Sequence, residues 1–429
     1  MQRNQLRRGA LPRLALAALL WVGVGFVVGI VVDRQVLADA VPTASIPASA
    51  KPDFRLLGEA WHLIEKHYVD RSAIRPQRMT YAAISGMVDS LGDTGHTTFL
   101  TPQQVHEAHE AMQGHFAGIG AEVRMRGKRV VVVAPLDGTP AQKAGLRPGD
   151  IIVKVDHQSV RGKTLEQVVR KIRGPVGTKV VLTIRKPHGD HTTPVPIVRA
   201  VIHVHSVSWH MLPGTHTADI RIASFSQGTA KELHHALRQA RAHHARAMVL
   251  DLRDDPGGLL NQAVDVASEF LRGGNVLLEK NAKGKVRPVA VESDEPTTRL
   301  PMVVLINAGT ASAAEIVTGA LEDAHRAKVV GQKTFGTGTV LEEFRLSDGS
   351  ALLLAVQEWL TPDGHTIWHK GITPQIKVAL AHKVTPVYPL ELKKMSAGKL
   401  RSSKDAQLLK AMQLLRNNGQ QPTQREASR

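Results

Sequence analysis

Apolar positions along this 429-residue chain alternate between short runs and longer segments with helical spacing. Residues 248–253 and 301–306 are short runs rich in Val, Leu and Ile, which is typical of buried strands. Each run is followed by a segment, over residues 259–271 and 311–324, in which apolar residues recur at helical spacing. This alternation of strands and helices predicts an α/β core over residues 200–380.

Helical patterns flank the core on both sides. Residues 54–101 are predicted to be helical, and residues 381–416 form a second helical segment that contains an amphipathic helix from Asp405 to Leu415. The polar tail at residues 417–429 is predicted to be disordered. The apolar face of the first segment contains Leu56, Leu57, Ala60, Leu63 and Ile64.

Residues 102–199 carry a third pattern, with short strands at 130–134 and 179–185 around one helical face. Within this pattern, the stretch Gly145-Leu-Arg-Pro-Gly-Asp150 resembles the signature of bacterial PDZ domains. In PDZ domains a loop of backbone N–H groups captures the C-terminal carboxylate of a peptide, and the peptide adds to the sheet as a strand. The alternative is a packing domain whose groove has degenerated. By this resemblance, the peptide-binding residues are Phe116, Gly118, Ile119 and Gly120.

The N-terminus predicts a membrane anchor. Residues Leu14–Val32 form an apolar run of 19 positions, about the length that spans a bilayer. Arginines precede the run within residues 1–13, so the positive-inside rule leaves the N-terminus cytoplasmic and the remainder extracytoplasmic, on a single-pass protein of the cell membrane. A cleaved signal peptide is the alternative, because Ala38-Asp-Ala40 resembles a cleavage site. Residues 33–53 are read as a linker.

Charge and composition limit the kinds of molecule that the chain is expected to bind. The chain has 55 Lys and Arg against 38 Asp and Glu, a formal net charge of +17. Because aromatic residues make up only 4% and the basic residues are scattered, nucleic acid is not predicted, and an anionic membrane or cell-wall surface fits better. The chain lacks cysteine and any His-Glu-x-x-His pattern, so no metal and no cofactor are predicted.

A candidate nucleophile lies in the segment Asn307-Ala-Gly-Thr-Ala-Ser-Ala-Ala-Glu-Ile316, between a predicted strand and a predicted helix. Ser312 falls in the first turn of that helix, where unpaired N–H groups and the helix dipole favour negative charge. A serine at such a position can attack a carbonyl while nearby N–H groups receive the oxyanion. The simpler interpretation is that Ser312 only caps the helix.

A second motif, Asp254-Asp-Pro-Gly-Gly258, follows the predicted strand at 248–253. Adjacent glycines between a strand and a helix allow the backbone N–H groups to approach a ligand closely. Together with the serine segment, this motif resembles the carboxyl-terminal processing proteases, a family of serine peptidases, over Phe54 to Leu415. The resemblance implies a crotonase-like ββα superhelix, with Ser312 as nucleophile. It also implies an oxyanion hole formed by the backbone of Gly257 and Gly258 and the N–H of Ala313.

The sequence departs from this family at the general base. Members usually carry a lysine within a Thr-Phe-Gly-Lys-Gly segment and a glutamine four residues later, but this chain has Thr337 and Leu341 at those positions. A threonine hydroxyl cannot accept a proton near neutral pH, and Lys333 is four residues from the required position. Both parts of the usual base system are therefore missing.

A histidine is the predicted replacement. His96, in Leu91-Gly-Asp-Thr-Gly-His-Thr-Thr-Phe-Leu100, lies in a segment that resembles one in the related tricorn-type peptidases, where a histidine acts as base. Imidazole suits this role because its unperturbed pKa is about 6.5. Glu358 is predicted to orient the imidazole, and His365 and His369 are further candidates. A loop histidine and a surface strand glutamate are the simpler alternatives.

Three other groups of residues receive structural interpretations. Asp323 lies about three turns after Ser312 and is therefore too far away to contact it. The pairs His234-His235 and His243-His244 are placed on the solvated face of a helix predicted over residues 229–247, and His203 and His205 point outward from a strand.

Two functions remain open at this point. The first is a membrane-anchored serine endopeptidase that recognises protein C-termini through its PDZ domain and cleaves by an acyl-enzyme mechanism. The second is a pseudopeptidase that binds peptide tails as an adaptor, because loss of a positioned base typically lowers the rate by about 10²–10⁴-fold.

Overall fold

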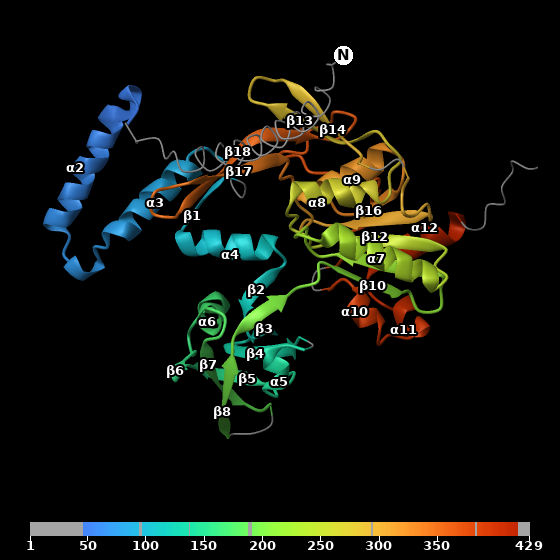
Figure 1. Cartoon of the computed structure of the whole chain (residues 1–429), viewed down its shortest axis with the longest axis horizontal. Coiled ribbons are helices and arrows are strands. Elements are labelled where there is room, and N and C mark those ends of the chain that lie inside the picture. Colours follow the sequence, from blue (N-terminus) through green and yellow to red (C-terminus); the bar gives the residue numbers. More distant parts are fainter. Residues whose placement is uncertain are drawn as a thin grey trace, which may run out of the picture. The chain divides into compact units, whose positions relative to one another are not determined.

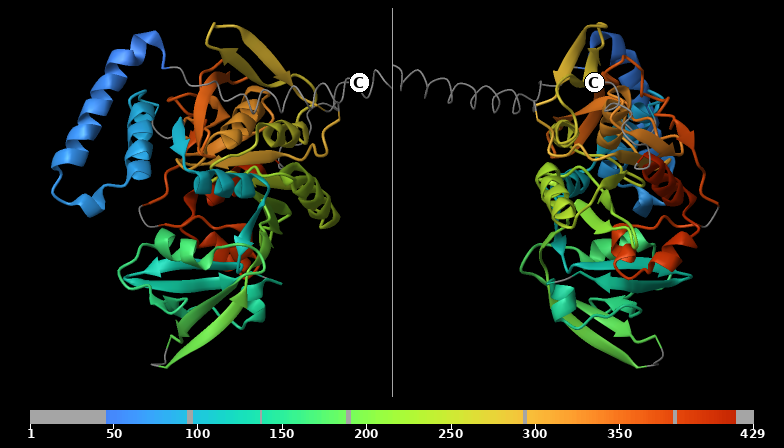
Figure 2. Two further views of the ribbon diagram at one scale, coloured as in Figure 1. Left: turned by 60° about the vertical axis from the view of Figure 1, so that its left-hand side comes forward. Right: turned by 90° about the vertical axis from the view of Figure 1, so that its right-hand side faces the viewer.

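The computed structural model describes residues 46–93, 97–136, 138–187, 191–292, 295–381 and 384–418. The chain forms two compact units (Figures 1 and 2). One contains Met1–Val105 with Glu342–Leu354, and the other contains His106–Leu341 with Ala355–Arg429.

The first unit is built from helices and short strands. Its elements are η1 (Ala48–Ala50), α2 (Lys51–His67), η2 (Arg71–Ala73), α3 (Pro76–Asp89) and β1 (Thr98–Leu100). β1 pairs in antiparallel register with the start of β18 (Ala351–Leu360). Tyr81 of α3 packs on Phe99 of β1 and donates a hydrogen bond to Asp348 (2.6 Å). Helix α2 buries none of its residues, so the predicted apolar face from Leu56 to Ile64 is largely exposed.

Within the second unit, the PDZ segment forms a six-stranded antiparallel sheet. Its strands are β3 (Ala121–Arg126), β4 (Arg129–Pro135), β5 (Ile151–Val155), β6 (Gln158–Ser159), β7 (Lys179–Arg185) and β8 (Thr192–Val198). The order is β3-β4-β5-β7-β8, with β6 on β5, so β3 is an edge strand. Helices α5 (Pro140–Lys143) and α6 (Leu165–Ile172) contribute to the same hydrophobic core. Helix α4 (Pro102–Met112) and the pair β2 (His115–Gly118) and β9 (Ala200–His203) connect this domain to the remainder.

The core domain is a six-stranded sheet with helices on both faces. Its order is β10 (Val207–Met211), β11 (Thr217–Ile222), β12 (Ala247–Asp251), β15 (Met302–Ile306), β16 (Lys328–Gly331) and β19 (Ile376–Lys377). All pairs are parallel except β10–β11. On one face the sheet packs against α7 (Thr229–Ala242), α8 (Leu260–Ser268) and α9 (Ala313–Asp323). On the other it packs against α10 (Pro389–Leu392), α11 (Ala397–Arg401) and α12 (Ala406–Asn418).

Strand alternation decides which helices each strand residue contacts. Met248 and Leu250 of β12 belong to the cluster of α7 to α9, whereas Ala247 and Val249 belong to the cluster of α10 to α12. All five residues of β12 are buried, which explains why the strand appears in the sequence as a continuous apolar run. A further sheet contains β13 (Asn275–Asn281), β14 (Val286–Ala290) and β17 (Thr339–Arg345) beside β18.

The prediction of an α/β fold is confirmed, with some boundaries corrected. The helix predicted over residues 229–247 ends at Ala242, because His244 takes a left-handed conformation and Ala247 starts β12. Ser312 precedes α9 instead of lying in its first turn. None of the helices in the described ranges is long and apolar enough to cross a membrane. The predicted anchor at Leu14–Val32 lies outside those ranges and stays a prediction.

Candidate active site

Ser312 stands at the N-cap of α9 with φ 53° and ψ −122°. This positive φ is uncommon for a residue with a side chain, and strained backbone of this kind gathers at functional sites. The Oγ atom makes no side-chain cap hydrogen bond, contrary to what a purely capping serine would do. The geometry therefore presents a half-buried hydroxyl at the start of a helix that follows a fully buried strand.

Gly257 lies directly against this serine. A Cβ atom added at Gly257 would come within 2.6 Å of Ser312 Cβ and 2.7 Å of Ala313 N, and the residue has φ 90°. Gly258 is equally constrained, because its added Cβ would lie 2.3 Å from the carbonyl oxygen of Phe225. Only glycine fits either position, so the sequence motif is required by close backbone approach.

Asp255 holds the turn formed by Gly257 and Gly258, called the glycine turn below. Its Oδ1 accepts a hydrogen bond from the Gly257 N–H (2.8 Å), and its carbonyl oxygen accepts one from the Ala311 N–H (2.9 Å). The Gly257 N–H is thus already occupied, although the family resemblance implies that the Gly257 backbone contributes to the oxyanion hole. The N–H groups of Gly258 and Ala313 donate no hydrogen bond within the described part of the chain, so they remain available to an oxyanion.

The carboxyl of Asp255 is itself unusual. It is fully buried, and its Oδ2 has no hydrogen-bond partner among the described residues. Burial raises the pKa of Asp255 to about 8, against the lowering effect of the Gly257 N–H. The carboxyl is therefore protonated at neutral pH, which keeps a negative charge away from the glycine turn.

Glu315 joins three parts of the site. Its carboxylate accepts hydrogen bonds from the backbone N–H groups of Ser312 (2.9 Å), Gly336 (2.8 Å) and Thr337 (2.9 Å). The Thr334 hydroxyl donates the fourth. Burial raises the pKa of Glu315, and these four donors counteract the rise. Because both oxygens are saturated, Glu315 is a positioning group and not a free base.

Thr337 is buried at the position where the resemblance predicts a lysine. The adjoining Gly338 accepts a hydrogen bond at its carbonyl oxygen from the Trp359 N–H (2.7 Å), which brings the end of β18 beside this loop. Glu358 therefore lies next to the loop, where its carboxylate pairs with Lys280 of β13 (3.1 Å). Lys333 is exposed.

The structure describes two of the three candidate histidines, His365 and His369. His96 lies outside the described residues, so its role stays a prediction. His369 lies beside the loop of Thr337, because its backbone N–H donates to the Gly336 carbonyl oxygen (2.9 Å). The imidazole ring of His369 stacks on Trp368. The N–H of His365 donates to Thr361 Oγ1 (3.3 Å), away from these contacts. Asp323 accepts a hydrogen bond from the Asp363 N–H (2.8 Å), in line with a structural role.

A cluster of buried ion pairs lies next to the glycine turn in the chain. Arg253, fully buried, pairs with Asp251 (2.6 Å) and with Asp405 (2.9 Å), which precedes α12. Opposite charges raise the pKa of Arg253 in spite of its burial. Arg253 precedes Asp254, whose N–H donates to Asn307 Oδ1 (2.9 Å), so the cluster links the C-terminal segment to both active-site loops.

The PDZ residues occupy the end of the domain where β2 meets β3. Phe116 and Gly118 pair with β9 in β2, and the guanidinium of Arg173 lies 4.7 Å from the Phe116 ring centre. Ile119 is buried in the domain core. Gly120 has φ 74°, and an added Cβ would clash with Thr139 at 2.4 Å. This loop leads directly into the edge strand β3.

Comparisons with known proteins assign the family. Residues 216–378 match the model of peptidase family S41, and residues 131–186 match that of the PDZ domain. Residues 216–378 therefore belong to peptidase family S41. The predicted family resemblance is therefore confirmed, and the match contains the glycine turn, Ser312 and Glu358.

Two similar bacterial proteins are longer than this chain. A probable CtpA-like serine protease of Staphylococcus epidermidis is 37% identical over 331 residues, which cover 76% of this chain and 65% of the relative. The corresponding protein of Staphylococcus aureus is 39% identical over 303 residues, covering 70% and 60%. This chain thus spans less than two thirds of these relatives. A solved photosystem II D1 C-terminal processing protease has 28% identity and a TM-score of 0.48, covering 82% of this chain and 98% of that structure.

Three residues of the site were not predicted from the sequence. Glu315 carried one signal, because a serine followed three residues later by glutamate at a helix start is the capping-box pattern. Asp255 had only its place before Pro-Gly-Gly, and Asp405 lies about 150 residues from Arg253 in the chain, a separation that no local pattern spans. In the described ranges no cluster of His, Asp or Glu is arranged to hold a metal ion.

Proposed function

We propose that this chain is a serine endopeptidase that recognises protein C-termini through its PDZ domain and cleaves by way of an acyl-enzyme. The observation that carries the proposal is the contact of Ser312 with the Gly257–Gly258 turn at the start of α9. The family assignment gives the same reaction class. The available N–H groups of Gly258 and Ala313 supply the two donors that an oxyanion needs.

The proposed chemistry has two steps. The Ser312 hydroxyl loses its proton to a base as Oγ attacks the scissile carbonyl carbon, and the oxyanion is held by the Gly258 and Ala313 N–H groups. Collapse breaks the C–N bond, and the base returns the proton to the leaving amine. Water then adds to the acyl-enzyme by the reverse proton path and releases the new C-terminus and Ser312.

We assign the base to His96, with Glu358 as the group that orients it. The resemblance of residues 91–100 to a segment of the tricorn-type peptidases supports this assignment, and Glu358 lies next to the loop of Thr337. His369 is the alternative base, because its backbone contacts Gly336 beside Thr337.

Peptide capture is assigned to the loop of Phe116, Gly118, Ile119 and Gly120. Among the described strands only β4 pairs with edge strand β3, and such an edge accepts an added strand. Peptides that end in a free carboxylate after an apolar residue should bind, and amidation of that terminus should weaken binding markedly. Equal affinity for free and amidated peptides would rule out carboxylate capture.

The site of action that we propose is the outer side of a cell membrane, near an anionic membrane or cell-wall surface. The apolar run Leu14–Val32 and the arginines before it support an uncleaved, single-pass anchor with a cytoplasmic N-terminus. N-terminal sequencing of the membrane-extracted protein tests this assignment. An intact N-terminus is expected, and a mature chain that starts near Val41 would contradict it.

A pseudopeptidase adaptor is the second candidate, and Thr337 favours it, because the family's lysine is replaced by a buried hydroxyl. Labelling of the full chain with a fluorophosphonate probe separates the two functions. Labelling that disappears in Ser312→Ala supports an activated nucleophile. If the folded wild type binds peptides but is never labelled, the endopeptidase proposal fails and the adaptor is favoured.

A further inference from the structure

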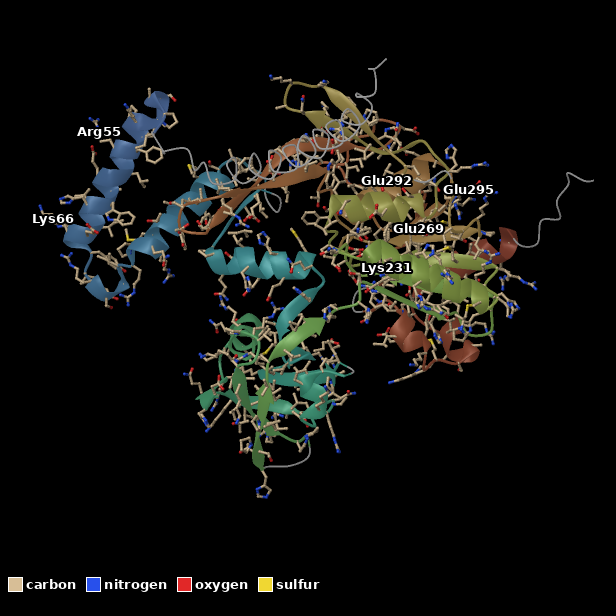
Figure 3. All side chains as sticks on the ribbon, viewed as in Figure 1. Arg55, Lys66, Lys231, Glu269, Glu292 and Glu295 are labelled. Atoms are coloured by element: carbon tan, nitrogen blue, oxygen red, sulfur yellow. The ribbon has the colours of Figure 1, made fainter. Side chains whose placement is uncertain are left out.

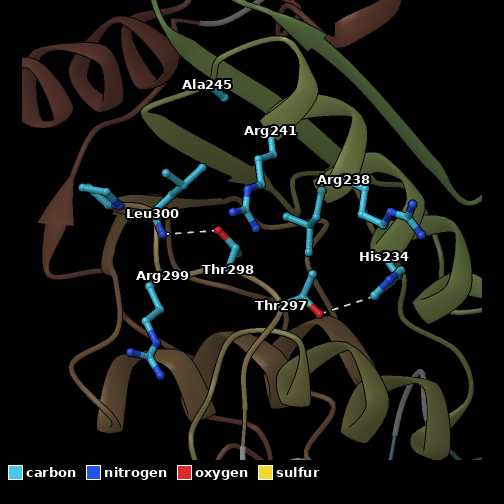
Figure 4. A pocket seen from close by; sticks show the side chains of 10 residues that line it. His234, Arg238, Arg241, Ala245, Thr297, Thr298, Arg299 and Leu300 are labelled. Atoms are coloured by element: carbon cyan, nitrogen blue, oxygen red, sulfur yellow. Dashed lines mark hydrogen bonds between the residues drawn. The ribbon is translucent and has the colours of Figure 1, made fainter.

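A cavity of about 730 Å³ lies on the core domain, away from Ser312, between helix α7 and the segment that leads into β15. Figure 4 shows its lining, in which side chains of α7 face residues 297–300. Arg238 and Arg241 enter from α7, and Arg299 from the opposite segment. The apolar part of the lining comes mainly from Leu237 and Leu300.

Two of these arginines have no acidic partner among the residues that the structure describes. His234 pairs with Glu269 (3.2 Å), and Arg299 pairs with Glu295 (2.9 Å), so these two carboxylates, both labelled in Figure 3, are already engaged. Arg238 and Arg241 form no ion pair within the described ranges. They stand three residues apart on an exposed helix face, a spacing from which two long side chains can reach one ligand, although their guanidinium groups point apart in Figure 4.

The segment opposite α7, residues 297–301, is held in place by the positively charged side chain of Arg326. The Arg326 guanidinium donates hydrogen bonds to the carbonyl oxygens of Thr298 (3.2 Å), Leu300 (2.9 Å) and Phe270 (3.2 Å). These partners are neutral, so the charge of Arg326 is not cancelled by a contacting carboxylate. Thr298 Oγ1 in turn accepts the Leu300 N–H (3.2 Å), which fixes this segment further.

Phosphate matches this cavity better than an apolar ligand or a cation. A guanidinium pairs with phosphate through parallel N–H donors, and two of them balance the charge of nearly −2 that a phosphate monoester carries at neutral pH. Leu237 and Leu300 can contact the organic part of such a ligand. An ordinary solvated helix face can also carry two arginines. It does not need, however, an opposite segment whose carbonyl oxygens are held by hydrogen bonds from Arg326.

We propose that this cavity binds a phosphate monoester, with the Arg238 and Arg241 guanidinium groups as its ligands. The phosphate is carried either by a small soluble ester or by a lipid headgroup. The site is separate from proteolysis, so its presence does not depend on the identity of the base for Ser312.

The test uses the full chain with two probes at about 0.15 M ionic strength, where contacts beyond about 8 Å are screened. Glycerol 3-phosphate is titrated by calorimetry, and vesicles of phosphatidylcholine with or without phosphatidic acid are used in a flotation assay. The test variant is Arg238→Gln with Arg241→Gln. The matched control is Lys231→Gln with Arg287→Gln, which removes two exposed positive charges outside the cavity.

Saturable binding of glycerol 3-phosphate is expected, weakened about tenfold or more in the arginine variant and unchanged in the control. If only the flotation on phosphatidic acid responds in this way, the ligand is a lipid headgroup. Absence of saturable binding to both probes, or an equal loss in the control variant, would overturn the proposal. Thermal unfolding of all variants, together with the two single arginine variants, separates loss of binding from loss of folding.

Discussion

The carboxylate of Glu315 accepts a hydrogen bond from the backbone N–H of Ser312, and the same carboxylate holds the loop of Thr337. One buried side chain thus sets the backbone of the candidate nucleophile and the backbone of the position where a lysine is absent. The contact explains how this loop keeps its place without the family's lysine, since the loop is held through N–H groups and not through its side chain.

Replacement of Glu315 by Gln should damage both stability and reactivity. An amide NH₂ cannot accept the N–H groups that face the carboxylate, so at least one buried donor loses its partner, at a cost of about 1–3 kcal/mol. Glu322→Gln on the same helix is the control, because burial raises the pKa of Glu322 and the neutral amide suits that site. Urea unfolding and fluorophosphonate labelling measure the two effects. Equal unfolding midpoints for the two variants would contradict the positioning role.

Gly257→Ala should abolish labelling of Ser312. The added methyl group would lie 2.6 Å from Ser312 Cβ, so either the turn or the serine must shift. Gly284→Ala is the matched control, because Gly284 also has a positive φ (77°) but an added Cβ meets nothing within 4 Å. The control should cost only backbone strain and leave the labelling rate unchanged. Similar labelling of both variants would show that Ser312 does not depend on the glycine turn.

Asp255 should give the stability a distinct pH dependence. Burial raises its pKa from 3.8 to about 8, so between these values the folded protein keeps a proton that the unfolded chain has released. The free energy of unfolding should therefore fall by up to about 1.4 kcal/mol per pH unit from pH 4 to 8 through this group.

Asp255→Asn should remove that contribution, because the amide oxygen can still accept the Gly257 N–H while carrying no titratable proton. The measurement is urea unfolding of wild type and variant at pH 5 and pH 8. The variant should gain stability relative to wild type as the pH rises, whereas exposed Asp89→Asn should not. A constant difference between wild type and the Asp255 variant at the two pH values would show that Asp255 does not hold a proton.

His96→Ala should lower kcat/KM by about 10²–10⁴-fold, close to the loss in Ser312→Ala, because members of a catalytic unit are not additive. Glu358→Gln should cost less, since it changes only the orientation of the imidazole. Thr337→Lys should bring no gain to a working pair of serine and histidine. Activity that survives in His96→Ala but not in His369→Ala would transfer the role of base to His369.

The sequence predicts the strands and helices well where local patterns suffice. The runs at 248–253 and 301–306 are β12 and β15, because both strands are buried on two faces. The structure also gives the reason for the glycine pair, since only glycine fits beside Ser312. The extent of α7 was overestimated, since its histidines at 243–244 continue a helical composition although the chain turns there.

What the sequence could not supply are contacts between distant segments. Arg253 and Asp405 are both buried charges whose pairing follows from the tertiary fold, and nothing at either position indicates its partner. The hydrogen bond from the Gly257 N–H to Asp255 Oδ1 likewise depends on one side-chain oxygen, which the family resemblance does not indicate when it implies that Gly257 belongs to an oxyanion hole.

The pairing of Arg253 with Asp405 also imposes an order of events on biosynthesis. A chain grows from its N-terminus, so Arg253 and Ser312 are both made well before Asp405 exists. Until Asp405 arrives, the guanidinium behind the glycine turn lacks one of its two carboxylates, and a buried charge in that state opposes closure of the loop. The hydroxyl of Ser312 should therefore remain unreactive until Asp405 and the start of α12 have been made.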